Sequence, residues 1–519
     1  MRERDVKKLI ALCLAFILLC GCAVTEQTDV PPTETESAPT QAPTQTPDAE
    51  PVTAFGMSYL PQYGFNPFLC SATLNRTYIS LLYESLFVVS DEFRAEPVLC
   101  ESFTSSEDGS VYRYTIFSDI FFSDGSAMTA EDVIASLKAA QSSDYYDERL
   151  EHIAALEADG AYTVVITLDT AYENFSLMLD VPIVKADTVE KAIPTGSGAY
   201  RIVGSVLRRN SHWRQTVSLV LDEESVRLYA ADDPTSIRDD FEFGGTDLVY
   251  CDPNAPSAVN YRCDYEVWEV PTTVLHYLGF NLYSGYFPIQ ELRTAVTRAI
   301  DREALVSNAY GGFAVPTLLP CSPNSDLYDT SLAASYSYSA EAMKAAVHNS
   351  GVLTNAEYAN HAGTLLVCSE DSARVAAAEA IAQSLRDAGL NITVNALVRD
   401  EYKTALEKGN FDLYYGEVRL TANFDLSVFF DSYGALRYGS ISDAGLSTLC
   451  TAALENSGSY PELCKQLLEN APICPVVFKS YAVYVTRGKL ANLTPTVDQV
   501  FHNSLNARDL SDADRSFAE

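Results

Sequence analysis

The chain has 519 residues, of which 47% are hydrophobic and 20% charged, so it is long and apolar enough to bury a large core. Its 70 acidic against 35 basic residues give a formal charge of −35, and such a surface repels phosphate backbones. We therefore expect no nucleic-acid partner. The charge favours solubility and says nothing about the fold.

The N-terminus has the pattern of an export signal. A head with four basic residues precedes the apolar run 9–19, which is too short to span a bilayer of about 30 Å as a helix. Small residues follow the apolar run, which completes the pattern of a secretory signal. The rest of the chain is therefore expected outside the cytoplasm.

The end of this signal, Leu19-Cys20-Gly21-Cys22, resembles the bacterial lipobox. The resemblance implies that residues 1–21 are removed and that Cys22 is diacylated as the first mature residue. Cys20 departs from the small Ala or Ser that is usual at its position. The alternative is an ordinary secreted protein cut near Ala23. A diacylglycerol supplies at least two acyl chains, which is what stable anchoring requires.

Residues 22–52 are expected to be the lipidated cysteine and a disordered tether. From Thr25 to Val52 the segment has no aromatic, Lys or Arg residue, and almost half of it is Thr or Pro. Such a composition cannot bury enough apolar surface to offset the entropy of ordering. A flexible chain of this length spans roughly 30 Å, so it would act as a spacer between a membrane and a folded body.

The clearest architecture in the body is a run of alternating strands and helices. Its members are the strands 364–368, 391–397 and 411–417 and the helices 372–388 and 400–408. A helix between successive strands implies parallel pairing through right-handed crossovers. Because ligands of such sheets bind beyond the carboxyl ends of the strands, the loop after Glu417 is a place to expect a site.

Catalytic and metal-binding patterns are not found in the sequence. The six histidines are scattered without metal spacing, and neither a GxSxG elbow nor a phosphate-binding GxxxxGK[ST] motif occurs. We expect no enzyme activity, cofactor or metal. Nine cysteines follow Cys22, and we expect most of them to be buried as small hydrophobic residues. Cys251 and Cys263 bracket a loop and are the one candidate pair for a disulfide.

A series of short motifs carries a resemblance to a known family. They are Tyr83-Glu-Ser-Leu86, Phe121-Phe-Ser-Asp-Gly125 with Met128-Thr-Ala-Glu-Asp-Val133, Pro194-Thr-Gly-Ser-Gly-Ala-Tyr200, Phe280-Asn281, Ala299-Ile-Asp-Arg302, Tyr310-Gly-Gly312, Gly409-Asn-Phe-Asp412 and Ala471-Pro-Ile-Cys-Pro475. In this order, over nearly all of residues 53–505, they resemble the bacterial extracellular solute-binding proteins of family 5, the dipeptide and oligopeptide binders of ABC importers. Each motif alone is weak, and most of them are expected to be scaffold.

The resemblance implies an α/β fold of the periplasmic-binding-protein type (type II, cluster C), with two lobes, a hinge and an extra inserted domain. The N-terminal lobe, domain I, would comprise 53–78, 183–278 and 480–519. Domain II would be the insertion 79–182, and the C-terminal lobe, domain III, would be 279–479. The lobes would close on a ligand, and a membrane permease would recognise the closed form.

The resemblance also suggests ligand-binding residues in the loop 418–425. The family's usual Gly-Trp pair appears here as Val418-Arg419, and its amine-binding aspartate falls on Ala422, so recognition of an α-amino group by the usual residue is in doubt. Asp425 matches a second acidic position. Arg419 is the loop's only cation and a candidate partner for a carboxylate or phosphate. The candidate ligand-binding residues are Arg419, Asn423, Asp425, Tyr481 and Tyr484.

We therefore expect a monomeric, lipid-anchored binding protein that captures a small peptide or similar solute and delivers it to ABC permease subunits. An acidic tether without an outer-membrane cue favours a Gram-positive surface over a periplasm. Three alternatives stay open: a binder of the same fold for an oligosaccharide or nickel chelate, a sensor lipoprotein without a transporter, and a secreted hydrolase.

Overall fold

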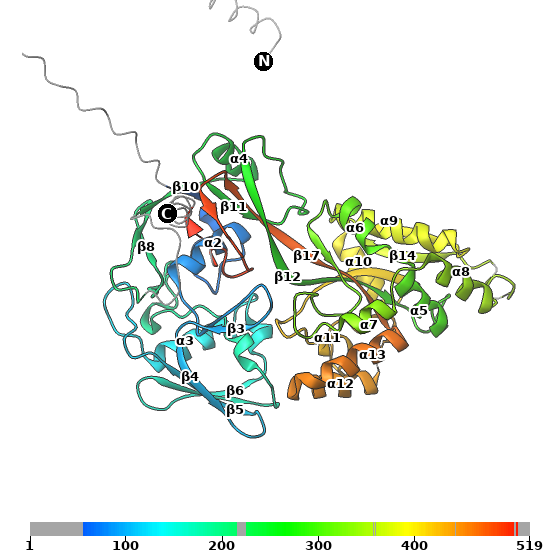
Figure 1. Cartoon of the computed structure of the whole chain (residues 1–519), viewed down its shortest axis with the longest axis horizontal. Helices are drawn as coiled ribbons and strands as arrows, with labels where there is room; N and C mark the ends of the chain where they lie inside the picture. The colour runs from blue at the N-terminus through cyan, green and yellow to red at the C-terminus, as the bar shows by residue number, and fades with distance from the viewer. Residues whose placement is uncertain are drawn as a thin grey trace, which may run out of the picture. The chain divides into compact units, whose positions relative to one another are not determined.

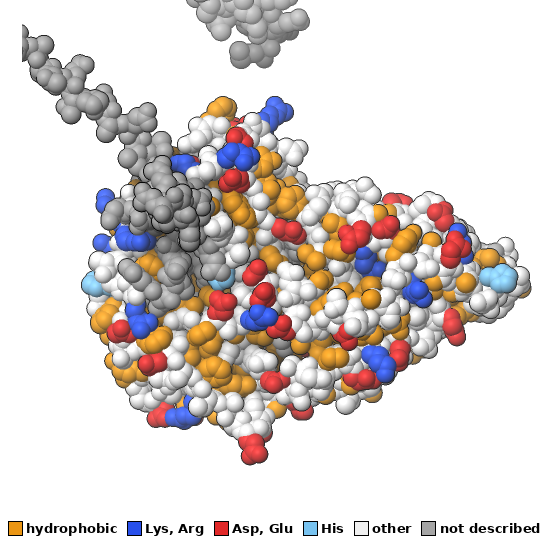
Figure 2. All heavy atoms as spheres, viewed as in Figure 1, with side chains coloured by type: hydrophobic (Ala, Val, Ile, Leu, Met, Phe, Trp, Pro, Cys, Tyr) orange, Lys and Arg blue, Asp and Glu red, His pale blue; other side chains and the backbone are white. Residues whose placement is uncertain are grey.

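The computed structural model describes residues 55–214, 225–356, 358, 360–441, 443–502 and 505–506. Cys22, the expected signal 1–21 and the expected tether 22–52 lie outside these residues. No helix in the described part of the chain is long and apolar enough to cross a membrane. Acidic side chains are spread over the face shown in Figure 2 rather than gathered in one region.

Helices and strands follow one another along the chain as shown in Figure 1. The helices are α2 Thr73–Leu82, α3 Ala130–Ala140, α4 Pro234–Glu242, α5 Gln290–Ala299, α6 Arg302–Ala309, α7 Thr330–Ser335, α8 Ala340–Asn349, α9 Ser372–Asp387, α10 Arg399–Glu407, α11 Ser427–Phe430, α12 Ala444–Glu455 and α13 Tyr460–Asn470. The strands are β1 Gly56–Tyr59, β2 Phe87–Val89, β3 Ala95–Pro97, β4 Cys100–Ser105, β5 Val111–Ile116, β6 Ile153–Ala158, β7 Thr163–Leu168, β8 Tyr200–Val203, β9 Val206–Arg209, β10 Ser225–Ala230, β11 Leu248–Cys251, β12 Tyr265–Phe280, β13 Ala314–Pro316, β14 Gly363–Cys368, β15 Ile392–Leu397, β16 Leu413–Arg419, β17 Ile473–Thr486, β18 Leu490–Ala491 and β19 Leu505–Asn506.

Most strands join one sheet of 11 strands, in the order β15-β14-β16-β12-β17-β11-β1-β10-β9-β8 with β13 paired to β17. Its two ends contain parallel pairs: β14 with β15 and β16, and β1 with β10 and β11. The middle is antiparallel, because β12 pairs with both β16 and β17. A separate antiparallel sheet, β4-β5-β7-β6, lies within the segment expected to be the insertion 79–182. The expected boundaries of the three domains stay a prediction.

The predicted run of strands and helices between residues 364 and 417 is confirmed. Strand β14 is parallel to β15 and β16, and α9 and α10 supply the crossovers. One boundary was wrong, since the expected loop from Val418 begins only after Arg419. The ladder with β12 continues to the pair Val274–Arg419, which places Arg419 at the end of a strand rather than in a loop.

The two longest strands, β12 and β17, connect separate groups of buried side chains. Core 1 draws mainly on residues 55–270 and 483–501, whereas cores 2 and 3 draw, apart from Phe93, on residues 275–478. Val270 of β12 and Val483 of β17 pack in core 1, but Leu278 and Val477 of the same strands pack in core 2. The paired strands are therefore the shared element of the two halves (Figure 1).

A buried polar chain joins β12 to its other neighbour, β16, and to Tyr310 at the end of α6. The Tyr415 and Tyr310 hydroxyls lie 2.8 Å apart, His276 Nδ1 is 2.8 Å from the Tyr310 hydroxyl, and His276 Nε2 is 2.8 Å from a Glu417 carboxylate oxygen. Burial lowers the pKa of His276. A neutral imidazole would donate from Nε2 to Glu417 and accept at Nδ1 from Tyr310, so every member of the chain is satisfied.

An ion pair joins β17 to the residue that follows β11. The Lys479 ammonium lies 2.6 Å from Asp252, and both side chains are mostly buried. The register of β12 against β17 shifts between Pro271 and Leu275, which marks a bulge where the two strands pass from core 1 to the other cores. The expected buried cysteines are found, whereas Cys251 and Cys263 are partly exposed free thiols rather than a disulfide.

Candidate functional site

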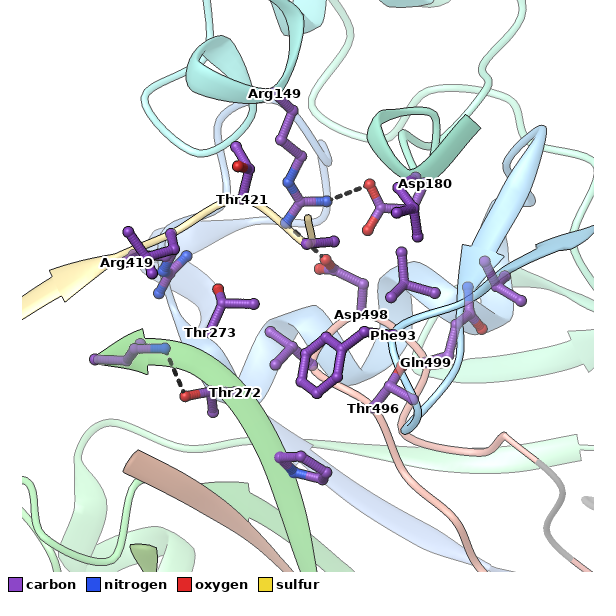
Figure 3. Close-up of a pocket in the computed structure, with 18 of the residues that line it drawn as sticks. Phe93, Arg149, Asp180, Thr272, Thr273, Arg419, Thr421, Thr496, Asp498 and Gln499 are labelled. Atoms are coloured by element: carbon purple, nitrogen blue, oxygen red, sulfur yellow. Dashed lines mark hydrogen bonds and ion pairs between the residues drawn. The ribbon is translucent and has the colours of Figure 1, made fainter. Parts of the chain in front are cut away.

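Four neighbouring cavities surround the end of β16. The central cavity, of about 80 Å³, is lined by Phe93, Tyr145, Arg149, Asp180, Thr272, Arg419, Tyr481 and Asp498 (Figure 3). The Arg76 cavity, of about 280 Å³, is lined by Arg76, Ser143, Tyr145, Tyr250, Arg419 and Tyr481. The acidic cavity, of about 660 Å³, is lined by Glu148, Glu151, His152, Arg419, Asp425 and Asp431. The aromatic cavity, of about 540 Å³, is lined by Phe87, Phe93, Phe103, Tyr112, Leu177, Ala422, Asn423 and Tyr460.

These cavities share walls, so we treat them as compartments of one cleft. Arg419 lines the central, Arg76 and acidic cavities together. Tyr481 separates the central from the Arg76 cavity, and Ala422 lies between the central and the aromatic cavity. The central cavity alone is smaller than the roughly 300 Å³ of a ligand pocket, but the composite cleft is not.

A network of opposite charges forms one side of the central cavity. Arg149 lies between two carboxylates, 2.6 Å from Asp180 and 2.9 Å from Asp498 (Figure 3). The other oxygen of Asp498 is 3.0 Å from Arg76, whose side chain is only 5% exposed. The Tyr145 hydroxyl donates to Asp498 over 3.1 Å. Asp498 therefore holds together an arginine from α2 and an arginine from the short 3₁₀ helix Asp147–Leu150.

The two carboxylates of this network titrate differently. Burial, only partly offset by Arg149, raises the pKa of Asp180 to about 6. Burial also opposes the ionisation of Asp498, but the two flanking guanidinium groups outweigh it and hold the pKa of Asp498 well below its usual value. The network is therefore a fixed, charged wall at neutral pH.

Tyr145 is surrounded by arginines. The guanidinium carbon of Arg76 lies 3.3 Å from the centre of its ring, that of Arg419 lies 5.0 Å away, and that of Arg149 lies 5.3 Å away. These are cation–π distances. Arg419 differs from the other two because, within the described residues, no carboxylate lies within 4.0 Å of it and its side chain makes no hydrogen bond. Its exposed guanidinium is thus available to an anionic ligand.

The acidic cavity lies on the other side of Arg419. Asp425 accepts two hydrogen bonds from Ser427, from the backbone N–H over 3.0 Å and from the hydroxyl over 2.8 Å, both at one carboxylate oxygen. Burial raises the pKa of Asp425 despite these bonds, and burial also raises the pKa of Glu148 and Glu151. A cationic group in this cavity would relieve the crowding of like charges.

The structure brings together three of the five residues expected at a ligand site. Arg419, Tyr481 and Asp425 line compartments that meet at Arg419. Asn423 lines the aromatic cavity and accepts a hydrogen bond from Thr421 over 2.7 Å. Tyr484 packs instead against other tyrosines, with its ring centre 5.0 Å from that of Tyr261 and 5.3 Å from that of Tyr265. Tyr481 and Tyr484 are three residues apart in a strand, so they point to opposite faces of the sheet.

Sequence reasoning missed the charged wall of the central cavity. Arg76 and Asp498 are 422 residues apart, and no local pattern connects positions at such a separation. The run Tyr145-Tyr-Asp-Glu-Arg149, which mixes aromatic and charged residues, was the one local sign of a site outside the loop 418–425.

One cluster in the described part of the chain has the composition of a metal site. His276, Asp371 and Glu417 each offer a ligand atom, and these atoms lie within 4.8 Å of one another. Protein cations already neutralise the two acids, because Arg374 Nε is 3.1 Å from Asp371 and Lys479 is 3.9 Å from Glu417. The cluster is better described as an internally paired polar network than as a site for a divalent cation.

The comparisons with known proteins agree with this geometry. The model of the bacterial extracellular solute-binding proteins, family 5 Middle, matches residues 94–436. The glutathione-binding protein GsiB of Salmonella paratyphi A is 25% identical over 271 residues, which are 48% of this chain and 52% of GsiB. The chain thus spans about half the length of the curated relatives it matches.

Solved structures are similar over a larger part of the chain. The ABC transporter substrate binding protein CtaP of Listeria monocytogenes gives a TM-score of 0.71 at 18% identity, covering 87% of this chain and 99% of CtaP. NikA of Brucella suis, solved with Fe(III)-EDTA, gives 0.67 at 16% identity, covering 87% of this chain and 99% of NikA. These similarities establish the expected fold, the two-lobe architecture of type II periplasmic binding proteins.

The charged wall makes a prediction about stability. Asp498→Asn keeps the shape of the side chain but leaves Arg76 and Arg149 without their shared carboxylate. We expect the free energy of unfolding at pH 7 to fall by about 3 kcal/mol, the usual cost of breaking a buried ion pair. Because the pKa of Asp498 is depressed, its contribution is present above the unfolded pKa of about 4 and is lost as the pH falls.

Urea denaturation of the wild type and the variant between pH 3 and pH 7 measures both effects. Asp159→Asn is the matched control, since Asp159 pairs with Arg113 on the surface, and an exposed pair contributes less than about 1 kcal/mol. Equal, small effects of the two substitutions would contradict the role given to Asp498.

Proposed function

This chain belongs to the bacterial extracellular solute-binding proteins of family 5, and we propose that it captures a peptide by lobe closure and delivers it to the permease of an ABC importer. The observation that carries the proposal is the arrangement around Arg419. An unpaired guanidinium stands at the wall shared by three cavities, and one of these cavities is lined by four carboxylates. A peptide has both a carboxylate and an amine to offer them.

Arg419 would bind the carboxylate of the ligand. Guanidinium binds carboxylates through two parallel hydrogen bonds, and the charge assistance makes each bond stronger than a neutral one. The ring of Tyr145 lies beneath the guanidinium and limits its movement without neutralising it. Tyr481, also in the central cavity, would contact the adjoining part of the ligand.

Asp425 would bind the amine. The family's usual amine-binding position is Ala422, which cannot do so, but Asp425 follows one turn later and faces the acidic cavity. One of its oxygens is held by Ser427, while the other makes no hydrogen bond to a described residue. Glu148, Glu151 and Asp431 add to the negative potential of the same cavity.

Relatives of this chain bind chemically different solutes. GsiB is a glutathione-binding protein, and glutathione is a peptide that carries an amine and carboxylates, which supports the peptide proposal. NikA was solved with Fe(III)-EDTA, a polycarboxylate chelate. The unpaired guanidinium of Arg419 in the central cavity makes such a chelate the second candidate. A sensor role would be favoured if no permease or ATPase gene lies near this gene.

We further propose that the protein is tethered outside the cytoplasm by a lipid on Cys22, on a Gram-positive surface, and that it works as a monomer without catalysis. The support for the tether is the sequence around Cys22 and the polar segment 25–52. The support for the lack of catalysis is the family, whose members are substrate-binding proteins of transporters.

Arg419→Gln tests the carboxylate site. We expect the affinity for a peptide with a free C-terminal carboxylate to fall by 10- to 100-fold, because a charge-assisted pair contributes about 1.5–3 kcal/mol. The C-terminally amidated form of the same peptide should bind the wild type and the variant equally weakly. Isothermal titration calorimetry measures the four affinities. Arg399→Gln, which removes an exposed arginine paired with Glu370, is the control. An equal loss for both peptides would argue against carboxylate recognition.

Asp425→Ala tests the amine site. Ligand affinity should fall by about 10-fold without a loss of apo stability, since burial already disfavours the ionised carboxylate. Because the pKa of Asp425 is raised, wild-type affinity for the amine should weaken as the pH falls through that raised value, and the variant should lack this dependence. Titration calorimetry across pH with a free and an N-acetylated peptide measures it. An unchanged affinity for the free peptide would remove Asp425 from the site.

Cys22→Ala tests the tether. The wild type should sediment with membranes and incorporate labelled palmitate, whereas the variant should do neither. If both proteins are released into the medium, the alternative of cleavage near Ala23 is correct.

A further inference from the structure

The charged carboxylate and amine of a peptide would not occupy the aromatic cavity, so this cavity needs a separate explanation. Its wall carries the rings of Phe87, Phe103 and Tyr112, and its volume of about 540 Å³ greatly exceeds that of the central cavity. Phe103 is 50% exposed although it is a large aromatic residue. Its ring centre lies 5.9 Å from that of Phe87, and the two rings meet edge to face. Such a wall suits an apolar group.

Phe93 stands between the aromatic and the central cavity. It lines both, as do only two other residues of their described walls, Leu177 and Ala422. Figure 3 shows its ring beside Asp498 and Gln499 at the edge of the central cavity. All three separating side chains are apolar, and Ala422 is small. Three side chains, which we call the partition, therefore line both cavities, and Phe93 is the largest of them.

The backbone holds Phe93 in this position. It occupies the turn between β2 and β3, where its N–H donates to the Ser90 carbonyl over 3.0 Å and the Ser90 N–H donates to the Arg94 carbonyl over 2.9 Å. Its φ of +60° is in the left-handed region, which bulky residues rarely adopt. Strained backbone of this kind persists where surrounding contacts determine it, often at ligand clamps.

Contacts to the other half of the molecule fix the same turn. Phe93 is counted with core 3, although β2 packs in core 1, and its ring centre is 4.9 Å from that of Phe424. Phe424 itself has a φ of +59° and lies in the loop that carries Ala422 and Asp425. Arg94 forms a bidentate ion pair with Asp326 at 2.8 and 2.9 Å. The partition therefore forms where the two halves meet.

The outer side of the aromatic cavity is polar. Arg94 and Asp326 line it there, together with Glu173, whose N–H donates to the Leu454 carbonyl over 2.7 Å and whose carboxylate accepts from the Ser457 N–H over 2.6 Å. The side that it shares with the central cavity, formed by Phe93, Leu177 and Ala422, is apolar. A side chain of a ligand held at Arg419 would reach the aromatic wall by passing Phe93.

We propose that the aromatic cavity is a subsite for a large apolar side chain of the bound solute, and that Phe93 determines whether such a side chain enters it. This inference rests on the proposed function. The acidic cavity cannot take the same group, because its carboxylates would lose hydration against an apolar surface. In the arrangement described here, Phe93 closes the partition and favours ligands with small side chains.

The test compares Ala-Ala-Ala with Ala-Phe-Ala on the full-length chain by isothermal titration calorimetry. Phe93→Ala should raise the affinity for Ala-Phe-Ala relative to Ala-Ala-Ala by at least about 10-fold over the wild-type ratio, as expected when a large apolar group gains a pocket. Phe93→Leu should give a smaller shift in the same direction. Adding Phe103→Ser to Phe93→Ala should remove the gain, because it makes the wall of the cavity polar.

Phe243→Ala is the matched control, since Phe243 is 84% exposed and lines none of the four cavities. It should leave the ratio at the wild-type value. A ratio unchanged by both Phe93 variants, in proteins that still bind peptides and melt cooperatively, would overturn the inference and leave the proposed function standing. A gain that survives Phe103→Ser would also overturn it. Failure of wild type and variants to bind either peptide would overturn the peptide proposal and the subsite with it.

Discussion

The pairing of β12 with β17 is the constraint on which the rest of the structure depends. The two strands run antiparallel through one core and then through two others, so they are the shared support of both halves. The polar chain through His276 ties β12 to β16, and the ion pair of Lys479 with Asp252 ties β17 to the end of β11, so each of the two strands is also held to its other neighbour. Arg419 ends the strand beside β12, and Tyr481 lies in β17, so the candidate ligand contacts stand on this strand pair or beside it.

Some charged side chains of the cleft are paired with each other, whereas Arg419 has no ionic partner among the described residues. Asp498 and Asp180 together neutralise Arg76 and Arg149, while Arg419, close to the same tyrosine ring, keeps its charge unpaired. On the far side of Arg419, burial raises the pKa of Asp425, Glu148 and Glu151, three of the carboxylates that line the acidic cavity. A pre-arranged site of this kind spends little free energy on ordering when the ligand arrives.

The succession of strands and helices between residues 364 and 417 could be predicted from the sequence, whereas the residues of the ligand site could be predicted only in part. The alternation of these strands and helices implied the parallel pairing that the structure shows. The loop after a strand was expected from the fold pattern, and Arg419 and Asp425 were singled out within it by the resemblance to the family. Asp498 and Phe93 could not be predicted. Asp498 contacts Arg76, which is 422 residues away in the sequence, and Phe93 packs in core 3 although its own hairpin begins in core 1. Tyr484 was expected beside Tyr481, but the two-residue period of a strand turns it to the opposite face.

The central claim is that the cleft around Arg419 holds a peptide. Mass spectrometry of small molecules released by denaturing the purified full-length protein tests it most directly, with the Arg419→Gln variant prepared in parallel. The account predicts a peptide with a free carboxylate that is released from the wild type and is depleted in the variant. An oligosaccharide or a metal chelate released equally from both proteins would contradict it.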